Sequence, residues 1–294
     1  MDVSRICIVG AGVMGPGIAQ TFAQAGYRVT INDIQENILN RALGIAEKNL
    51  KKAAERGKID DKEVRPTLER ITPVLDFNQA VSDVDMVVEA VPEDMGLKQK
   101  VFAQLDMVCP KRTILASNTS ALSPTEIASA TNRPEKVVGM HFFNPPHIMK
   151  LVEVTRGLLT SDDTSETVYQ IARKIGKEPV RINEMPGGVA SRLNVLLNNE
   201  AFNMLQEGVA SAEDIDKSLK FGLNYPMGTF EIVDLVGLDV RLSVLETLHK
   251  GLGEKYRPSP LLVKYVKAGR LGKKVGRGVY EYTADGKRKQ EEVS

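Results

Sequence analysis

The sequence predicts an α/β domain with a parallel sheet, followed by a second domain made only of helices. In the first two-thirds of the chain, short runs rich in β-branched residues alternate with longer segments whose apolar residues recur every three or four positions. This alternation is typical of a parallel sheet that is covered by helices. After the sequence MPGG at residues 185–188, the strand-like runs stop and only helical patterns remain. We therefore predict two domains, residues 1–184 and residues 185–294.

Each strand expected in the first domain is a short apolar run. These runs lie at residues 5–10, 29–33, 85–90, 113–118, 137–143, 151–154 and 179–182. Helices are expected between them, and the clearest lie at residues 15–26, 35–57 and 165–177. In the segment 35–57, the apolar residues form one stripe along a helix that ends at Gly57.

The second domain is expected to consist of helices, because convincing strand alternation is absent from its sequence. The helices are expected at residues 191–208, 211–222, 232–251 and 261–269. Apolar residues lie on more than one side of these segments, so we expect the helices to pack against a partner subunit as well as against each other. A homodimer formed through this domain is the expected assembly.

Composition and charge exclude several classes of protein. The 294 residues include 39 lysines and arginines against 38 aspartates and glutamates, so we expect neither nucleic acid nor an anionic membrane as a partner. No apolar run is long enough to span a membrane, and we expect no targeting peptide before the first strand. Cys7 and Cys109 form no paired motif, so we expect buried reduced thiols and no metal site. These features predict a cytoplasmic globular protein.

A glycine-rich loop follows the first predicted strand and opens the first helix. It comprises Gly10, Ala11, Gly12, Val13, Met14 and Gly15. In such a loop the first glycine permits a tight turn, the second lets the backbone approach a pyrophosphate, and the third lets the helix pack on the strand. The helix N-terminus then offers free N–H groups to the phosphates. The loop predicts a Rossmann-like dinucleotide-binding domain, and a plain glycine-rich turn is the alternative.

Asp33 stands at the end of the second predicted strand, where an acidic residue meets the hydroxyls of the adenosine ribose. A carboxylate at this place repels a 2′-phosphate, so we expect NAD rather than NADP as the cofactor. The glycine pattern is weak evidence when it stands alone. In this chain the strand, the helix, the second strand and the acidic residue all occur at the right spacing.

The segment HFFNPPHIMKLVEV, residues 141–154, predicts an antiparallel hairpin that brings a histidine and a glutamate together. If the reversal centres on His147, opposed residues have numbers that sum to 294, and His141 and Glu153 are such a pair. Directly opposed residues share a face of the sheet with Cβ atoms about 4.5–5.5 Å apart, so the imidazole and the carboxylate could hydrogen-bond. A slip of one residue would put them on opposite faces. His147 itself is expected to be exposed in the turn, without a role.

A histidine paired with a carboxylate is suited to general base catalysis. The carboxylate fixes the tautomer of the ring and stabilises the imidazolium that forms when the ring takes a proton. Beside a bound NAD, the matching chemistry is the oxidation of an alcohol, in which the histidine takes the hydroxyl proton and the nicotinamide takes the hydride. A structural hairpin whose histidine is merely hydrogen-bonded is the alternative.

Four motifs, in this order and spacing, resemble the short-chain L-3-hydroxyacyl-CoA dehydrogenase family. The motifs are GAGVMGPGIA, ASNTSAL, HFFNPPHIMKLVEV and YPMGTFEIVDLVGLD, and the resemblance runs from about residue 4 to residue 282. It implies an NAD-binding first domain, a helical dimerisation domain, and an acyl-CoA substrate bound in a cleft between them. It also implies that His141 is the catalytic base and that Glu153 orients it.

The resemblance implies roles for residues outside the hairpin. Ser120 matches a serine that contacts both the substrate hydroxyl region and the cofactor. Contacts with the cofactor are implied for Glu93, Lys98, Asn144 and Lys274.

The family places two lysines against the phosphates of CoA, and Lys52 and Lys58 match them near the end of the long predicted helix. Without the resemblance, Lys52, Lys58 and Lys98 would each be assigned to a solvated face.

The second domain departs from the family pattern at one place. Ser191 stands where the family commonly has a substrate-binding asparagine, and Gly188 stands where it has an aromatic residue. Serine can still donate and accept a hydrogen bond, but its side chain is shorter. We keep Ser191 as a substrate-binding residue, and the departure affects the expected acyl-pocket contacts more than the chemistry.

Three functions are compatible with these residues. The first, which we expect, is NAD-dependent interconversion of a (3S)-3-hydroxyacyl-CoA, such as 3-hydroxybutyryl-CoA, and the 3-ketoacyl-CoA. The second is the same chemistry on a free hydroxy acid or sugar acid, and the presence of Lys52 and Lys58 argues against it. The third is a non-catalytic dinucleotide-binding protein. That function predicts loss of His141, Glu153 or Ser120, and all three are intact.

Overall fold

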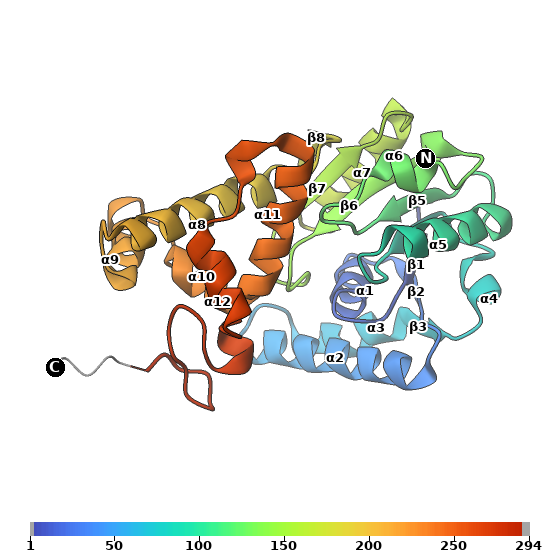
Figure 1. Ribbon diagram of the computed structural model, residues 1–294. Coiled ribbons are helices and arrows are strands. Elements are labelled where there is room, and N and C mark those ends of the chain that lie inside the picture. The colour runs from blue at the N-terminus through green and yellow to red at the C-terminus, as the bar shows by residue number, and fades with distance from the viewer. Residues whose placement is uncertain (1–2, 290–294) are drawn as a thin grey trace. The chain divides into compact units, whose positions relative to one another are not determined.

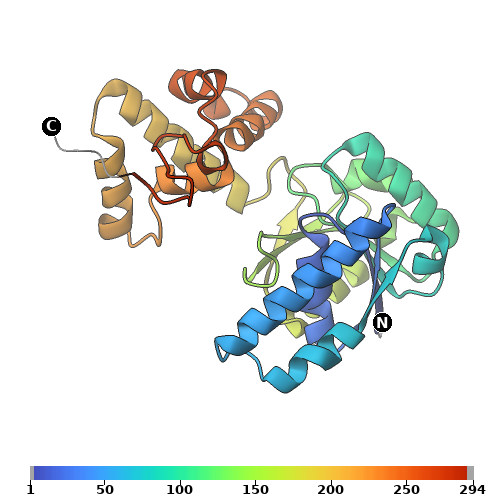
Figure 2. The ribbon, with the colours of Figure 1, turned by 90° about the horizontal axis from the view of Figure 1, so that it is seen from below.

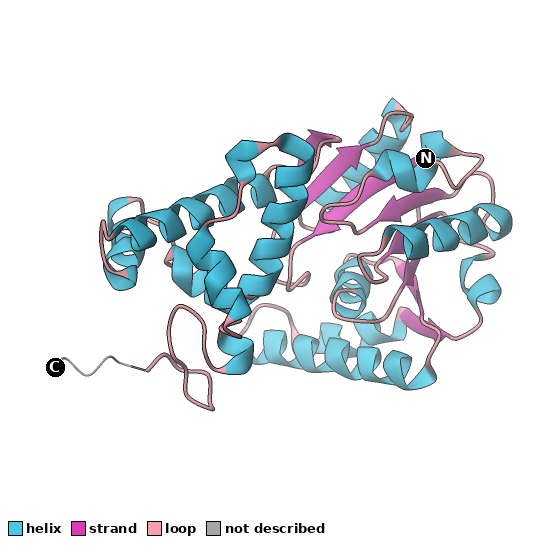
Figure 3. Ribbon diagram, in the orientation of Figure 1, coloured by secondary structure: helices cyan, strands magenta, loops and turns pink. Residues whose placement is uncertain are grey.

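The computed structural model describes residues 3–289, which form two compact units divided between Gly188 and Val189. The first unit is a sheet covered by helices, and the second consists of helices and loops (Figures 1 and 3). The prediction of a Rossmann-like α/β domain followed by a helical domain is therefore confirmed.

The first unit is built on an eight-stranded sheet with the order β3-β2-β1-β4-β5-β6-β7-β8. The strands are β1 (Arg5–Val9), β2 (Arg28–Asn32), β3 (Ile71–Val74), β4 (Met86–Glu89), β5 (Ile114–Ser117), β6 (Val137–Phe142), β7 (Leu151–Arg156) and β8 (Glu178–Asn183). Neighbouring strands are parallel except β6 and β7, which are antiparallel. The strand order reverses between β1 and β4, and ligands of such sheets bind beside this point, at the carboxyl ends of the strands.

Helices cover both faces of this sheet (Figure 2). They are α1 (Gly15–Gln24), α2 (Glu36–Glu55), α3 (Val64–Glu69), α4 (Phe77–Val81), α5 (Met95–Val108), α6 (Pro124–Ala128) and α7 (Asp162–Lys174), with short 3-10 turns at Asp61–Glu63 and Pro134–Lys136. One core holds Phe22 of α1, and the core on the other face holds Phe102 of α5. Cys7 and Cys109 are free thiols buried in the second core, as predicted.

The edge strand β3 is an element that the sequence pattern does not predict. In its sequence ITPV, Ile71 is buried and Val74 is half-buried, while Thr72 and Pro73 are exposed. The strand therefore shows neither a continuous apolar run nor a clear alternation. Proline has no backbone N–H to donate to a neighbouring strand. Because β3 lies at the edge of the sheet, one of its sides pairs with no strand, and a proline is tolerated there.

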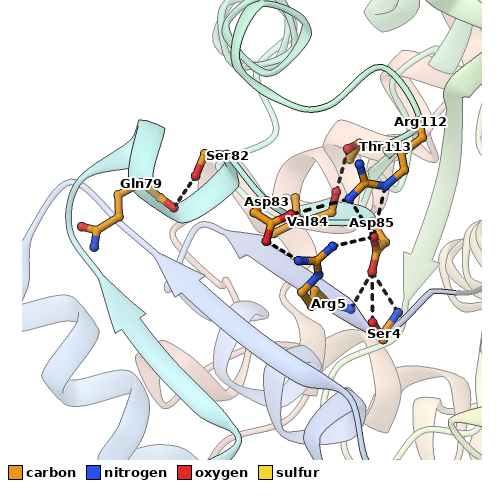
Figure 4. A network of polar contacts seen from close by, with 9 residues as sticks. All are labelled: Ser4, Arg5, Gln79, Ser82, Asp83, Val84, Asp85, Arg112 and Thr113. Carbon is orange, nitrogen blue, oxygen red and sulfur yellow. Dashed lines mark hydrogen bonds and ion pairs between the residues drawn. The ribbon is translucent and has the colours of Figure 1, made fainter.

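A polar network ties together the amino ends of the central strands (Figure 4). The carboxylate of Asp85, just before β4, accepts hydrogen bonds from the backbone N–H groups of Ser4 (3.1 Å) and Arg5 (3.0 Å). Arg112, just before β5, donates to the same carboxylate at 3.3 Å. Burial raises the pKa of Asp85, but these hydrogen bonds outweigh burial and hold the pKa at about 2. The network fixes β1, β4 and β5 at the ends opposite to those where a ligand is expected.

The hairpin predicted at residues 141–154 is confirmed, together with its register. β6 and β7 pair with His141 opposite Glu153 and with Phe142 opposite Val152. Phe142 and Val152 are both buried in the core. A slip of one residue would expose this apolar pair to solvent, so the burial of its side chains sets the register.

The turn between β6 and β7 is held by a buried lysine. Lys177 donates hydrogen bonds to the carbonyl oxygens of Pro146 (2.5 Å) and Met149 (2.9 Å). His147 lies in this turn and is half-buried, so the prediction of an exposed histidine is wrong in that respect. Burial, and then the positive charge of Lys177, lower the pKa of His147.

The second unit consists of helices packed around their own apolar core. The helices are α8 (Ala190–Glu207), α9 (Ala212–Lys217), α10 (Thr229–Val236), α11 (Leu238–Leu252) and α12 (Pro260–Lys267), with short turns η3 (Ser218–Gly222), η4 (Glu254–Tyr256) and η5 (Lys273–Val275). In the core, the rings of Phe202 and Phe230 meet edge to face at 5.1 Å. The single helix predicted over residues 232–251 is two helices, because Gly237 interrupts it with a φ of +114°. Within residues 3–289, no helix is both long and apolar enough to cross a membrane.

Candidate active site

The glycine-rich loop between β1 and α1 has the geometry that a dinucleotide requires. Gly10 has a φ of +104°, and a Cβ on it would lie 2.7 Å from the carbonyl carbon of Ala90. A Cβ on Gly15 would overlap the carbonyl oxygen of Gly10. At Gly12, by contrast, the place of a Cβ is open space. The fold therefore needs the first and third glycines, and the second leaves room for a ligand.

The N-terminus of α1 faces this loop. Met14 is the N-cap residue, Pro16 occupies the first turn, and no side chain of the described residues caps the helix. The backbone N–H groups of the first turn lack intrahelical partners, and the positive end of the helix dipole lies beside them. Within the loop, Ala11 is buried and Val13 is exposed. Such a helix N-terminus is suited to the pyrophosphate of NAD.

Asp33 follows β2 and reaches across to the glycine-rich loop. Its Oδ2 accepts a hydrogen bond from the backbone N–H of Ala11 at 2.9 Å, and its Oδ1 accepts one from the N–H of Gln35 at 3.3 Å. The carboxylate is thereby fixed beside the loop, at the end of a strand where it can meet the hydroxyls of a ribose.

We expect Asp33→Ala to narrow the preference for NADH over NADPH, because the variant lacks the carboxylate that repels a 2′-phosphate. NADH itself should bind about tenfold more weakly, since the loop loses the charge-assisted hydrogen bond at Ala11. Fluorescence titration with each nucleotide measures both affinities. An unchanged ratio of the two affinities would assign the discrimination to another residue.

His141 and Glu153 form a hydrogen-bonded pair on neighbouring strands. Nδ1 of His141 lies 2.9 Å from Oε2 of Glu153, and 13% of the histidine side chain and 3% of the glutamate side chain are exposed. Because an ionised carboxylate only accepts hydrogen bonds, Nδ1 carries the proton and Nε2 is left as the basic nitrogen. The ring of His141 also packs against Phe143, with centroids 4.5 Å apart. The pair can orient a base toward an external group.

Glu93 organises the loop after β5 that carries Ser120. Its Oε1 accepts hydrogen bonds from the hydroxyl of Thr119 (2.6 Å), from the N–H (2.9 Å) and hydroxyl (3.3 Å) of Ser120, and from the N–H of Ala121 (3.1 Å). Burial raises the pKa of Glu93, but the Thr119 hydrogen bond and the charge of Lys98 outweigh it and lower the pKa below its usual value. Ser120 is exposed, so its hydroxyl remains accessible to a ligand.

Lys98, for which the resemblance implies a cofactor contact, is buried. Its side chain has no exposed surface, and its ammonium lies 2.7 Å from Oε1 of Glu89 and 3.3 Å from Oε2 of Glu93. The assignment of Lys98 to a solvated face is therefore wrong. This burial also does not fit a direct contact between Lys98 and a cofactor bound at the surface. Lys98 contacts Glu93, which in turn holds the loop of Ser120. Glu89 was not predicted, although a charged residue at the end of the apolar run MVVE is a signal that could have found it.

Three further predicted residues lie at the surface of the first unit. Asn144 is exposed in the turn after β6, and a cis peptide bond joins it to Pro145. Lys52 lies in the last turn of α2, Lys58 lies just beyond the helix, and both are exposed. Their positions are accessible to a ligand, and their roles stay predictions.

Two predicted residues belong to the second unit. Ser191 is half-buried in the first turn of α8. Lys274 lies in the short turn η5, and its ammonium is 2.6 Å from both carboxylate oxygens of Asp239. If Lys274 contacts the cofactor, its ammonium group must bind both the cofactor and Asp239.

A cavity of about 90 Å³ in the first unit links several of these residues. Ser120, Glu153, Thr155, Glu184 and Gly188 all contribute to its lining. A Cβ on Gly188 would lie 3.0 Å from Oε2 of Glu153, so the absence of a side chain there leaves the carboxylate undisturbed. The cavity places free space beside Glu153 and Ser120. Among residues 3–289, no group of three or more His, Cys, Asp and Glu side chains could hold a metal ion.

Known protein families match both parts of the chain. The family model described as the NAD binding domain of 3-hydroxyacyl-CoA dehydrogenase matches residues 5–185, and the model of the C-terminal domain matches residues 187–282. The chain belongs to the 3-hydroxyacyl-CoA dehydrogenase family. It is an NAD-dependent dehydrogenase, so the predicted family, enzyme class and cofactor are confirmed.

Individual members of the 3-hydroxyacyl-CoA dehydrogenase family match nearly the whole chain. A protein of Bacillus subtilis (strain 168) named "Probable 3-hydroxybutyryl-CoA dehydrogenase" is 49% identical over 96% of this chain and 98% of its own length. A 3-hydroxybutyryl-CoA dehydrogenase of Clostridioides difficile is 43% identical over 95% of this chain and 99% of its own. The crystal structure of (S)-3-hydroxybutyryl-CoA dehydrogenase from Ralstonia eutropha has a TM-score of 0.93 and 39% identity, and covers 96% of this chain and 100% of that chain.

Proposed function

We propose that the protein interconverts a (3S)-3-hydroxyacyl-CoA and the corresponding 3-ketoacyl-CoA, with His141 as the general base and Glu153 as its orienting partner. The observation that carries this proposal is the 2.9 Å hydrogen bond between the two side chains, and Glu153 lines the same cavity as Ser120. The nucleotide loop supplies the second requirement, because it suits NAD and lies in the same unit of the chain.

In the oxidation direction, Nε2 of His141 takes the proton of the substrate hydroxyl. Glu153 keeps the proton of Nδ1 in place and stabilises the imidazolium that forms. The glycine-rich loop and Asp33 would hold NAD, which would supply the acceptor for the hydride of the carbon that carries the hydroxyl. The loop of Ser120 is held by its backbone N–H bond to Glu93, and the Ser120 hydroxyl turns from Oε1 of Glu93 to donate a hydrogen bond to the same oxygen of the substrate. In the reverse direction His141 returns the proton to the carbonyl oxygen.

We propose a short acyl chain, as in 3-hydroxybutyryl-CoA. Relatives that are 43–49% identical carry that name. Lys52 and Lys58 are proposed to meet the phosphates of CoA, since both ammonium groups are exposed at the same end of α2. Ser191 is proposed to bind the substrate, while Asn144 and Lys274 are proposed to bind the cofactor.

We further propose that the second unit forms a homodimer. Large apolar side chains are exposed on it, and Phe221 (84%), Leu193 (66%) and Leu223 (64%) are examples. Exposed apolar surface of this kind marks protein interfaces when it is contiguous. A cytoplasmic location is part of the same proposal.

The activity is tested by following NADH oxidation at 340 nm with acetoacetyl-CoA, in comparison with free acetoacetate and with NADPH. We expect rapid turnover only with the thioester and NADH. Turnover with free acetoacetate would instead support the alternative, the same hydride chemistry on a free hydroxy acid or sugar acid. Binding of NADH without turnover of either compound would contradict both.

A further inference from the structure

An ion pair without any exposed surface lies beneath the proposed site. The side chains of Lys98 and Glu89 are each 0% exposed, and the ammonium lies 2.7 Å from Oε1 and 3.0 Å from Oε2 of the carboxylate. Lysine and glutamate are almost never fully buried, because the cost of removing both charges from water rivals their mutual attraction. Apolar side chains of similar volume often stabilise a fold as well. The pair therefore calls for an explanation other than packing.

The carboxylate of Glu89 is fixed by the strands around it. Glu89 ends β4, and its Oε1 accepts a hydrogen bond from the N–H of Val91 at 2.7 Å. Its Oε2 accepts a hydrogen bond from the hydroxyl of Ser117 at 2.6 Å, and Ser117 is its direct neighbour at the end of β5. The position of the Lys98 ammonium is thus set by the carboxyl ends of two central strands, β4 and β5.

Lys98 in turn fixes the position of Glu93. Its ammonium lies 3.3 Å from Oε2 of Glu93, while Oε1 of the same carboxylate accepts the hydrogen bonds of Thr119, Ser120 and Ala121. One carboxylate therefore connects a buried cation on one side with the loop that carries Ser120 on the other. The three charged groups sum to one negative charge, so Glu93 can remain an anion that accepts hydrogen bonds from the loop.

We propose that Glu89 and Lys98 are positioning residues, which hold Glu93 and, through it, the loop of residues 119–121 in the orientation that the reaction and the cofactor need. The inference rests on the proposed function, because it assigns Ser120 to the substrate hydroxyl. Both side chains are 0% exposed, so their effect on the loop is transmitted through Glu93. An uncharged pair in their place would fill the same volume but would release Oε2 of Glu93.

The test is the double variant Glu89→Gln/Lys98→Met, which removes both charges and nearly preserves both shapes. Lys98→Met alone leaves the buried carboxylate of Glu89 without its cation, and Glu89→Gln alone leaves Lys98 only the longer contact with Glu93, so each single variant is expected to lower the thermal midpoint. The double variant should recover a midpoint within a few degrees of the wild type. Its kcat with acetoacetyl-CoA and NADH should nevertheless fall about tenfold, and NADH should bind several-fold more weakly.

A second substitution separates positioning from a merely structural role. Glu93→Gln should lower kcat in the wild-type background but have little further effect in the double variant, where Glu93 has already lost its anchor. The control Arg65→Met/Glu69→Gln removes an exposed ion pair of 2.8 Å on α3 and should leave kcat and NADH binding unchanged. A double variant with wild-type kcat and NADH affinity would overturn the inference. So would an equal effect of Glu93→Gln in both backgrounds.

Ser117→Ala carries the same test if the double variant fails to fold. It removes only the 2.6 Å hydrogen bond to Oε2 of Glu89, which keeps its contact with Lys98, and we expect kcat to fall a few-fold and the thermal midpoint to fall by several degrees. A wild-type kcat and NADH affinity in this variant would overturn the inference. If the wild type binds NADH but does not turn over acetoacetyl-CoA, the proposed function fails, and the NADH affinities of the variants still decide whether Glu89 and Lys98 position the loop.

Discussion

We expect His141→Gln to lower kcat with acetoacetyl-CoA and NADH by about two to four orders of magnitude, the usual contribution of a general acid or base, and to leave NADH binding nearly unchanged. The reason is that the glutamine amide can accept a hydrogen bond but cannot exchange a proton with the substrate oxygen. Glu153 still finds a hydrogen-bond donor in the new side chain, so the hairpin should stay folded. Steady-state kinetics and NADH titration on the same preparation measure the two effects.

The matched control for this variant is His147→Gln. His147 lies in the turn of the same hairpin, six positions from His141, but outside the pair with Glu153. We expect its substitution to change kcat by less than about threefold, as is usual for substitutions away from a reacting group. If His141→Gln loses turnover and NADH binding in equal measure, His141 has a structural role and the catalytic assignment is wrong.

The second large effect is expected at Gly15. Gly15→Ala should lower the free energy of unfolding by about 1–3 kcal/mol, because the new methyl group overlaps the carbonyl oxygen of Gly10. In a helix, alanine is more favourable than glycine by up to about 1 kcal/mol. This gain in stability is smaller than the cost of moving the strand-to-helix turn. NADH binding should weaken at least about tenfold in addition, since the loop that receives the pyrophosphate is displaced.

Gly12→Ala provides the contrast, because its methyl group would project into open space. The free energy of unfolding should stay within about 0.5 kcal/mol of the wild type. NADH should still bind at least about tenfold more weakly, since the methyl group occupies the place where backbone and pyrophosphate approach each other. Chemical denaturation and NADH titration of both variants check the pattern. Wild-type NADH affinity in Gly12→Ala would mean that the dinucleotide does not bind over this loop.

Much of the fold follows from local patterns in the sequence. The central parallel strands β1, β4 and β5 are buried on both faces, so they appear as apolar runs that need no tertiary information to find. The pairing of His141 with Glu153 follows from counting along one hairpin, because its apolar residues permit only one register. The steric roles of Gly10 and Gly15 likewise follow from a loop whose geometry is shared by all folds of this type.

The features that were missed depend on contacts between distant segments. β3 lacks an apolar pattern because it lies at the edge of the sheet and buries little of its surface. Lys98 is predicted at the surface from its residue type, and only its approach to Glu89 and Glu93 explains its burial. The break of α10 and α11 at Gly237 depends on a positive φ, which a sequence with glycine permits but does not demand.

The measurement that tests the central claim most directly is the pH dependence of kcat/KM in both directions, for the wild type and His141→Gln. A base must be neutral to take the proton of the hydroxyl, so kcat/KM for oxidation of (3S)-3-hydroxybutyryl-CoA should rise with pH. The same group must be protonated to serve the reverse reaction, so kcat/KM for reduction of acetoacetyl-CoA should fall with pH over the same range. We predict these mirror-image profiles for the wild type and their absence in His141→Gln. Profiles that persist in the variant would contradict the assignment of His141 as the catalytic base.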